Sequence, residues 1–214
     1  MTEEEARVWL SAHFDVSRET MARLERFVAI LLAAMDEQNL IAESTRPHIW
    51  ARHIVDSAQL LTHGSAAGEG AWVDLGSGAG LPGIVVACLS ERPVLMVESR
   101  RKRIDFLNEA IALLNLPHAS VFGGRVEMVL PRAAAVISAR AYAPLPRLLE
   151  SAAHLSDKNT LWVLPKGRNA QNELEATRPS WQGVFHVEPS VTDADSAIIV
   201  AHAVKPVVRK KGRA

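Results

Sequence analysis

The sequence predicts a doubly wound α/β fold, with a seven-stranded, mostly parallel sheet, helices on both faces and an N-terminal helical extension. Three observations lead to this prediction. Residues 1–63 carry apolar residues at helical spacing and no strand pattern, and short apolar runs alternate with helical stretches from residue 71 onward. A glycine-rich bend follows the first apolar run. Nearly continuous apolar strands are typical of parallel sheets that are buried on both faces.

Composition limits the class of protein. The 214 residues are 48% hydrophobic and 22% charged, which is typical of a globular chain with one large domain and a small extension. No apolar run approaches the roughly 18 residues that a membrane-spanning helix needs, and the acidic start at Met1–Glu5 is unlike a secretory signal. We therefore expect a cytoplasmic protein without a membrane partner. A single cysteine, Cys88, excludes an intramolecular disulfide and a cysteine-based zinc site.

The first 63 residues are expected to form a helical cap. A short helix is predicted over residues 3–13 and a longer one over 18–38, in which apolar residues recur every three or four positions. A third helix is predicted from about Pro47 to Leu61, with Trp50 and Ile54 on its apolar face. After a glycine-rich loop at 64–70 the pattern changes to that of a sheet domain, which we place at 64–206, with a basic tail at 207–214.

Seven strands are predicted in the sheet domain. Helical patterns fill the first gaps between them, whereas the last two strands are separated by a loop only, which predicts an antiparallel pair at the end. The expected strands are Ala71–Leu75, Val94–Val97, Ala119–Phe122, Ala134–Ile137, Thr160–Leu164, Gly183–Val187 and Ala197–Val204.

The bend after the first strand predicts a ligand cradle. Glycine allows positive φ and close approach of the backbone to a ligand, and proline suits the first turn of a helix. Doubly wound folds bind ligands at this carboxyl edge of the sheet. The bend contains Asp74, Gly76, Gly78, Gly80, Leu81, Pro82 and Gly83.

Two ligands are compatible with this loop. Residues 78–83 match the dinucleotide pattern G-x-G-x-x-G, and Glu98 follows at the end of the second strand, where it can accept hydrogen bonds from ribose hydroxyls of either ligand. Asp74 favours S-adenosylmethionine, because a carboxylate can meet its positive methionyl end and would repel a pyrophosphate. The alternative to a protein that binds S-adenosylmethionine is an NAD(P)-dependent oxidoreductase that uses the same glycines.

Six motifs in order extend the pattern beyond the loop and cover about residues 35–204. They are Arg52-His53-Ile54-Val55-Asp56-Ser57, the loop Asp74–Gly83, Glu98-Ser99 with Lys102-Arg103 and Phe106-Leu107, Gly124-Arg125-Val126-Glu127, Ser138-Ala139-Arg140-Ala141, and Leu164-Pro165-Lys166-Gly167. Together they resemble the small-subunit ribosomal RNA guanine-N7 methyltransferase family, also called glucose-inhibited division protein B. Glu98 is found where many members carry Asp, and Gly124 where many carry Ser.

The resemblance implies a class I, Rossmann-like methyltransferase that methylates guanine N7 in 16S ribosomal RNA of the small ribosomal subunit, at the family's target in the decoding-region 530 loop. Its cofactor would be S-adenosylmethionine and its product S-adenosylhomocysteine. Guanine N7 has a free lone pair and no proton, so no general base is expected. The enzyme is expected to act as a monomer without metal. A non-catalytic RNA-binding or assembly factor on the same fold is a further alternative.

The resemblance also implies a set of site residues. Arg140 would be the catalytic residue that positions the substrate, and it would face both cofactor and substrate from the end of the fourth strand. The cofactor would contact Asp74, Gly76, Gly78, Gly80, Leu81, Glu98, Val126, Glu127 and Arg140. His53 and Asp56 would border the cleft or, alternatively, dock the cap onto the domain. Tyr142 would stack on an extruded base or simply pack.

Basic residues are candidates for phosphate contacts with RNA. Residues 1–70 hold six Arg and eleven acids, so the positive charge lies in the rest of the chain, mainly at 100–103 and in the last ten residues. Neutralising phosphates releases counterions and favours nucleic-acid binding. The expected RNA-binding residues are His53, Arg103, Arg125, Lys166, Arg209, Lys210 and Lys211.

Overall fold

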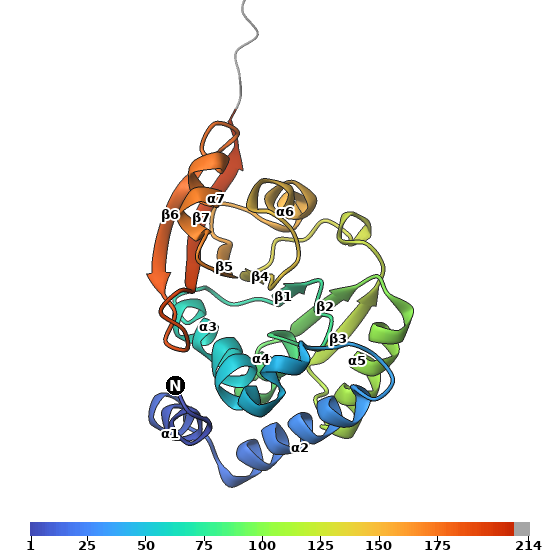
Figure 1. Ribbon diagram of the computed structural model, residues 1–214. Coiled ribbons are helices and arrows are strands. Elements are labelled where there is room, and N and C mark those ends of the chain that lie inside the picture. The colour runs from blue at the N-terminus through green and yellow to red at the C-terminus, as the bar shows by residue number, and fades with distance from the viewer. Residues whose placement is uncertain (208–214) are drawn as a thin grey trace, which may run out of the picture.

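The computed structural model describes residues 1–207 and contains one seven-stranded sheet with the order β3-β2-β1-β4-β5-β7-β6 (Figure 1). β7 runs antiparallel to both of its neighbours, and the pairs β1–β2, β1–β4, β2–β3 and β4–β5 are parallel. The predicted sheet and its final antiparallel pair are therefore confirmed. The strands are β1 (Trp72–Leu75), β2 (Val94–Glu98), β3 (Ala119–Gly123), β4 (Val136–Ser138), β5 (Leu161–Lys166), β6 (Trp181–Pro189) and β7 (Ala197–Pro206).

Helices cover both faces of the sheet (Figure 1). One face carries α3 (Asp56–Gly64), α4 (Gly83–Leu89) and α5 (Arg101–Leu113), with α1 (Glu3–His13) and α2 (Arg18–Ala34) outside them. The other face carries α6 (Leu145–Ala152) and α7 (Ala170–Thr177). Within residues 1–207, no helix has the length and apolar character to cross a membrane.

The third predicted helical stretch is confirmed in its extent, but it is not one regular α-helix. The chain forms a 3-10 helix at Glu43–His48, a π-helix at Trp50–Val55 and only then α3. Pro47 lacks an N–H group and restricts the residue before it, which disfavours an α-helix across this point. The Glu3 carboxylate of α1 accepts hydrogen bonds from the Trp50 and Ala51 amides, both at 3.0 Å, so these groups need no helical partner.

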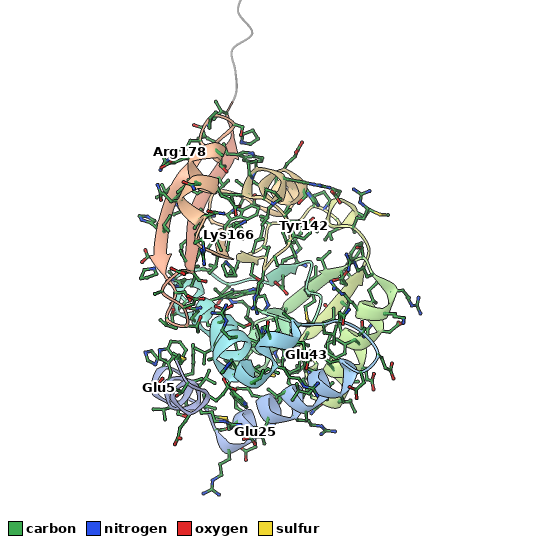
Figure 2. The ribbon with its side chains drawn as sticks, in the orientation of Figure 1. Glu5, Glu25, Glu43, Tyr142, Lys166 and Arg178 are labelled. Carbon is green, nitrogen blue, oxygen red and sulfur yellow. The ribbon has the colours of Figure 1, made fainter. Side chains whose placement is uncertain are left out.

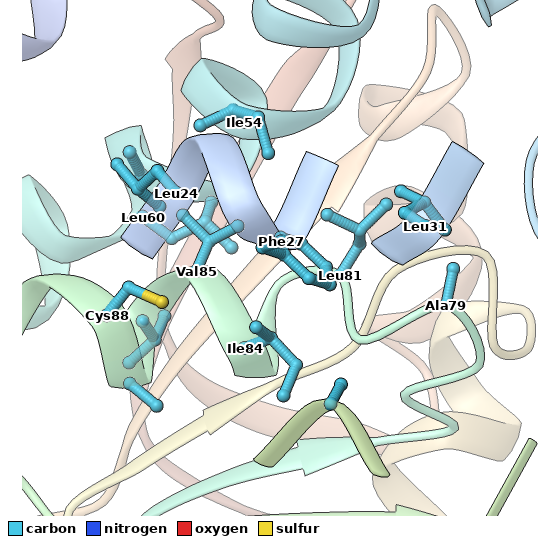
Figure 3. Close-up of a cluster of buried hydrophobic side chains, with 14 of the residues drawn as sticks. Leu24, Phe27, Leu31, Ile54, Leu60, Ala79, Leu81, Ile84, Val85 and Cys88 are labelled. Atoms are coloured by element: carbon cyan, nitrogen blue, oxygen red, sulfur yellow. The ribbon is translucent and has the colours of Figure 1, made fainter. Parts of the chain in front are cut away.

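The cap shares its core with one face of the sheet. Leu24, Phe27 and Leu31 of α2 belong to the same buried cluster as Ile84 and Val85 of α4 (Figure 3). Ala79 and Leu81 of the glycine loop lie in this cluster too. The helical cap therefore packs against the glycine loop.

Alternation along β1 assigns its side chains to the two faces. Trp72 packs in the cluster on the α4 side, whereas Val73 and Leu75 pack in the cluster on the α6 side. Successive side chains of a strand point to opposite faces, so Asp74 points toward α4. This orientation decides what its carboxylate contacts.

Candidate active site

Two cavities lie side by side at the carboxyl edge of the sheet. The first, here the loop cavity, has a volume of about 480 Å³, and its lining includes Gly76, Glu98 and Glu127. The second, here the cap cavity, has a volume of about 440 Å³, and its lining includes Arg140 and Lys166. The segment 141–144 lines both cavities, so it forms their common wall.

Gly76 lies where the backbone, the loop cavity and Tyr142 meet. Its φ is +67°, a region that favours glycine. A Cβ at this position would lie 2.6 Å from Cδ2 of Tyr142. The tyrosine ring therefore covers the glycine at the common wall, and both interpretations of Tyr142, base stacking and packing, stay open.

Asp74 is completely buried beneath the loop and does not line the loop cavity. Its Oδ2 accepts a hydrogen bond from the Gly83 amide at 3.1 Å, and its Oδ1 accepts one from the Ser138 hydroxyl at 2.8 Å. Burial raises the pKa of Asp74 to about 6, although hydrogen bonds from Ser77, Ser138 and Gly83 oppose the shift. The expected contact between this carboxylate and a cofactor is thus corrected: Asp74 positions the loop.

The same placement bears on the dinucleotide alternative. A dinucleotide places its pyrophosphate at the N-terminus of the helix that follows the glycine loop. Here the Gly83 amide, the first of α4, already donates its hydrogen bond to the Asp74 carboxylate. An anionic pyrophosphate at this end of the helix would meet a buried carboxyl group in place of a free amide.

Glu98 ends β2 and organises the loop cavity. Its side chain is only 5% exposed. Oε2 accepts from the Gly78 amide at 3.0 Å, and Oε1 accepts from the amides of Ser99 and Arg100 at 2.7 and 2.8 Å. These bonds fix the carboxylate at the cavity wall, where remaining lone pairs can accept hydroxyl hydrogens.

The remaining expected cofactor residues divide into two groups. Val126 and Glu127 line the loop cavity as expected. Gly78, Gly80 and Leu81 do not line it. Leu81 is 7% exposed and packs in the core, and a Cβ on Gly80 would lie 2.5 Å from Cγ1 of Ile84. The last two positions therefore serve packing of the loop, which is a correction to their expected cofactor contact.

Two arginines that we expected to bind RNA also line the loop cavity. Nη1 of Arg103 lies 4.0 Å from Oε2 of Glu98, and Nε of Arg125 lies 3.5 Å from Oε2 of Glu127. Both guanidinium groups therefore lie beside acids of this cavity, and their expected contacts with RNA stay a prediction.

Arg140 lies on the other side of the common wall, in the cap cavity only. Its Nη2 donates to the Arg52 carbonyl at 3.1 Å, and its Nε lies 3.4 Å from Oδ2 of Asp56. The side chain is 27% exposed, so part of the guanidinium faces the cavity. Arg140 therefore lies across the common wall from the loop cavity, and its expected contacts with cofactor and substrate stay a prediction.

Asp56 docks the cap onto the sheet domain. Its Oδ1 accepts from the Thr192 hydroxyl at 3.1 Å and from Nε2 of Gln59 at 3.0 Å. Arg52 pairs with Asp193 in the same loop between β6 and β7. Of the two interpretations of this motif, docking describes Asp56, which at the same time lines the cap cavity.

His53 is 5% exposed, so it is corrected from an RNA contact to a buried residue. The Thr45 hydroxyl donates its only hydrogen to the Ala42 carbonyl at 2.7 Å. It must therefore accept the hydrogen of His53 Nε2, at 2.7 Å, which leaves His53 Nδ1 as a buried lone pair. Burial, together with the charges of Arg140 and Arg52, lowers the pKa of His53 to about 3.

This shift predicts a pH dependence of stability. The unfolded ring binds a proton below its ordinary pKa of 6.5, and the folded ring does so only below about 3, so the contribution of His53 to the free energy of unfolding should fall as pH falls between these values. Asp74 contributes with the opposite sign between about 6 and 3.8, because its folded pKa is raised. The slope is at most about 1.4 kcal/mol per pH unit. A His53→Gln variant should lose this slope in urea titrations at several pH values, whereas His13→Gln at an exposed position should keep it. Equal slopes for wild type and His53→Gln would contradict the assignment.

Lys166 and Glu173 form a pair at the far end of the common wall. Nζ of Lys166 lies 2.8 Å from Oε2 of Glu173 and donates to the Ala143 carbonyl at 3.3 Å. Oε2 of Glu173 also accepts from the Leu145 amide at 3.0 Å. The side chain of Lys166 is only 9% exposed and is held in this ion pair at the lining of the cap cavity, and its expected RNA contact stays a prediction.

Sequence reasoning missed Glu173 and left Tyr142 open. Glu173 lies in a polar helix without a motif, and nothing in the local pattern marks it. Figure 2 shows Tyr142 and Lys166 on the α6 and α7 side of the strands, above the cap. Arg209, Lys210 and Lys211 lie outside the described residues.

The chain is similar to known proteins over most of its length. A family model described as rRNA small subunit methyltransferase G matches residues 20–197. Ribosomal RNA small subunit methyltransferase G of Sphingopyxis alaskensis is 54% identical over 99% of this chain and 91% of its own length. The protein of the same name from Zymomonas mobilis is 50% identical over 100% of this chain and 99% of its own length.

Solved structures share the fold at low sequence identity. A mutant of MtNAS in complex with S-adenosylmethionine has a TM-score of 0.59 and 15% identity, covering 94% of this chain and 83% of that chain. A SAM-dependent methyltransferase from Aquifex aeolicus has a TM-score of 0.57 and 12% identity, covering 74% of this chain and 93% of that chain. The Rossmann-like fold is therefore confirmed.

Proposed function

Because this chain belongs to the rRNA small subunit methyltransferase G family, we propose that it transfers a methyl group from S-adenosylmethionine to guanine N7 of 16S ribosomal RNA. The observation that carries the proposal is the pair of cavities with a common wall at 141–144. One cavity suits the cofactor and the other the acceptor base, so the two reactants would lie on either side of Tyr142.

The loop cavity fits the cofactor by the chemistry of its lining. Gly76 has no Cβ to occupy the space, and the buried Glu98 carboxylate can accept hydrogen bonds from ribose hydroxyls. Val126 and Glu127 offer an apolar side chain and a carboxylate for adenine and its amino group. When bound, the cofactor supplies an activated methyl group on a positively charged sulfur.

The chain's own task is positioning. Guanine N7 donates its lone pair to the methyl carbon while the carbon–sulfur bond breaks and its electrons stay on sulfur, so no proton has to be moved. Holding two reactants in line can lower a barrier by several kcal/mol. Arg140, fixed by Arg52 and Asp56 in the cap cavity, would orient the acceptor base.

We expect the chain to act as a monomer, since one copy supplies both cavities. We expect it to work in the cytoplasm, on the guanine of the 530 loop that the family resemblance implies. The basic residues Arg209, Lys210 and Lys211 would add phosphate contacts.

Two measurements test the proposal against its alternatives. Small ribosomal subunits from a deletion strain, incubated with the protein and methyl-labelled cofactor, should gain label at one guanine that is methylated in the parent strain. No label on any ribosomal substrate would favour a non-catalytic assembly factor. Calorimetry that detects NAD(P) binding and no S-adenosylmethionine binding would favour the oxidoreductase alternative.

A further inference from the structure

The cap cavity has walls that suit a planar base. Tyr142, Pro144, Pro165 and Ile198 contribute flat or apolar surfaces to its lining. Unstacked bases in protein–RNA complexes pack against such side chains, tyrosine among them. A volume of about 440 Å³ is also within the range of pockets that hold small molecules, roughly 300–1,000 Å³.

Two ion pairs lie at the two ends of the common wall. Arg140, immediately before the wall, pairs with Asp56. Lys166 pairs with Glu173, and these two residues bind the backbone at Ala143 and Leu145. Each cation of these pairs is therefore accompanied by a carboxylate inside the cavity.

The two carboxylates differ in their free acceptor capacity. Asp56 uses Oδ1 for Gln59 and Thr192, and its Oδ2 faces Arg140. Glu173 uses only Oε2, for Lys166 and Leu145, and within residues 1–207 its Oε1 has no hydrogen-bond donor. The Glu173 side chain is 30% exposed, so this oxygen is accessible from the cavity that it lines.

We propose that the cap cavity receives the target guanine as an unstacked base and that the Glu173 carboxylate binds the donors of its Watson–Crick edge. This inference rests on the proposed function, because it places the acceptor of that reaction. Guanine presents N1–H and an N2 amino hydrogen side by side, and the two lone pairs of the free Glu173 Oε1 can accept both hydrogens. Adenine presents a lone pair at N1, which a carboxylate repels, so the contact selects guanine.

The charge of the product favours the same arrangement. Methylation at N7 leaves the guanine ring with a positive charge, which nearby unpaired cations would destabilise. In the cap cavity, the charges of Arg140 and Lys166 are offset by Asp56 and Glu173. Glu173 at the Watson–Crick edge therefore stabilises the charge that develops during methyl transfer.

Inosine provides a direct test, because it lacks the N2 amino group and keeps N7 and O6. We would reconstitute small ribosomal subunits on RNA that carries guanosine or inosine at the methylated position, and assay wild type, Glu173→Gln and Glu175→Gln. Glu175 is an exposed residue of the same helix and serves as the matched control. Glutamine keeps the length of the side chain and can still accept from the Leu145 amide.

We expect the effect of Glu173→Gln on kcat/KM to depend on which base stands at the methylated position. Wild type and Glu175→Gln should prefer guanosine about tenfold in kcat/KM, since one hydrogen bond to a charged group contributes roughly 1.5–3 kcal/mol. Glu173→Gln should lose activity on both substrates, because the developing charge is common to both, but it should lose several-fold more on guanosine than on inosine. Equal losses on both substrates, or no preference in wild type, would overturn the assignment.

A binding measurement separates this inference from the proposed function. Sedimentation of cofactor-free protein with the two kinds of subunit reports affinity without methyl transfer. If no subunit is methylated yet wild type binds guanosine subunits more tightly and Glu173→Gln does not, the function fails and the pocket assignment holds. If methylation occurs and neither protein distinguishes the two bases, the function holds and the assignment fails.

Discussion

Replacement of Arg140 by alanine is expected to lower kcat/KM for methylation of small ribosomal subunits by about 100-fold or more. Removing one positioned donor from an active site costs about that much in enzymes where it has been measured. Arg140 contacts Asp56 and the Arg52 carbonyl in the cap cavity, so its loss would also remove the contacts that hold this side of the cavity together. Single-turnover rates with saturating cofactor measure the effect on the transfer step.

The control for Arg140 must separate activity from folding. Arg26→Ala removes an exposed arginine on α2 and should leave the rate near wild type. Cofactor affinity of Arg140→Ala, measured by calorimetry, should stay within about threefold of wild type, because Arg140 does not line the loop cavity. An activity near wild type for Arg140→Ala would show that its assigned place in the reaction is wrong.

Replacement of Gly76 by alanine should reduce S-adenosylmethionine affinity by about tenfold or more. The new Cβ would lie 2.6 Å from Tyr142 in a backbone conformation with φ of +67°, which costs roughly 1–2 kcal/mol for other residues. Either the tyrosine or the loop must move, and both line the cavity. Calorimetric titration with the cofactor measures the change.

Two further variants separate the causes. Gly68→Ala is the matched control, since a Cβ there meets no atom within 4 Å and its φ is not in the positive range. Adding Tyr142→Ala to Gly76→Ala removes the collision and keeps the backbone strain, so partial recovery of affinity assigns the difference to the ring. Wild-type affinity in Gly76→Ala alone would contradict the position of the cofactor in this cavity.

The order of elements could be predicted from sequence because it depends on local periodicity. Apolar residues at spacings of three and four gave the first two helices, and short apolar runs gave all seven strands to within a few residues. The irregular first turns of the third helical stretch could not be predicted, because they depend on Glu3, which is nearly fifty residues away and accepts from the Trp50 and Ala51 amides.

By itself the sequence determined the fold, the glycine loop and, through six ordered motifs, the family. Only the tertiary structure decided which polar residues face a cavity. Asp74 turned out to be a buried anchor of α4, His53 a neutral buried ring, and Lys166 the partner of Glu173. The physical reason is that periodicity specifies the face of an element, whereas a side chain's partner depends on packing between distant segments, as with Asp56 and Thr192.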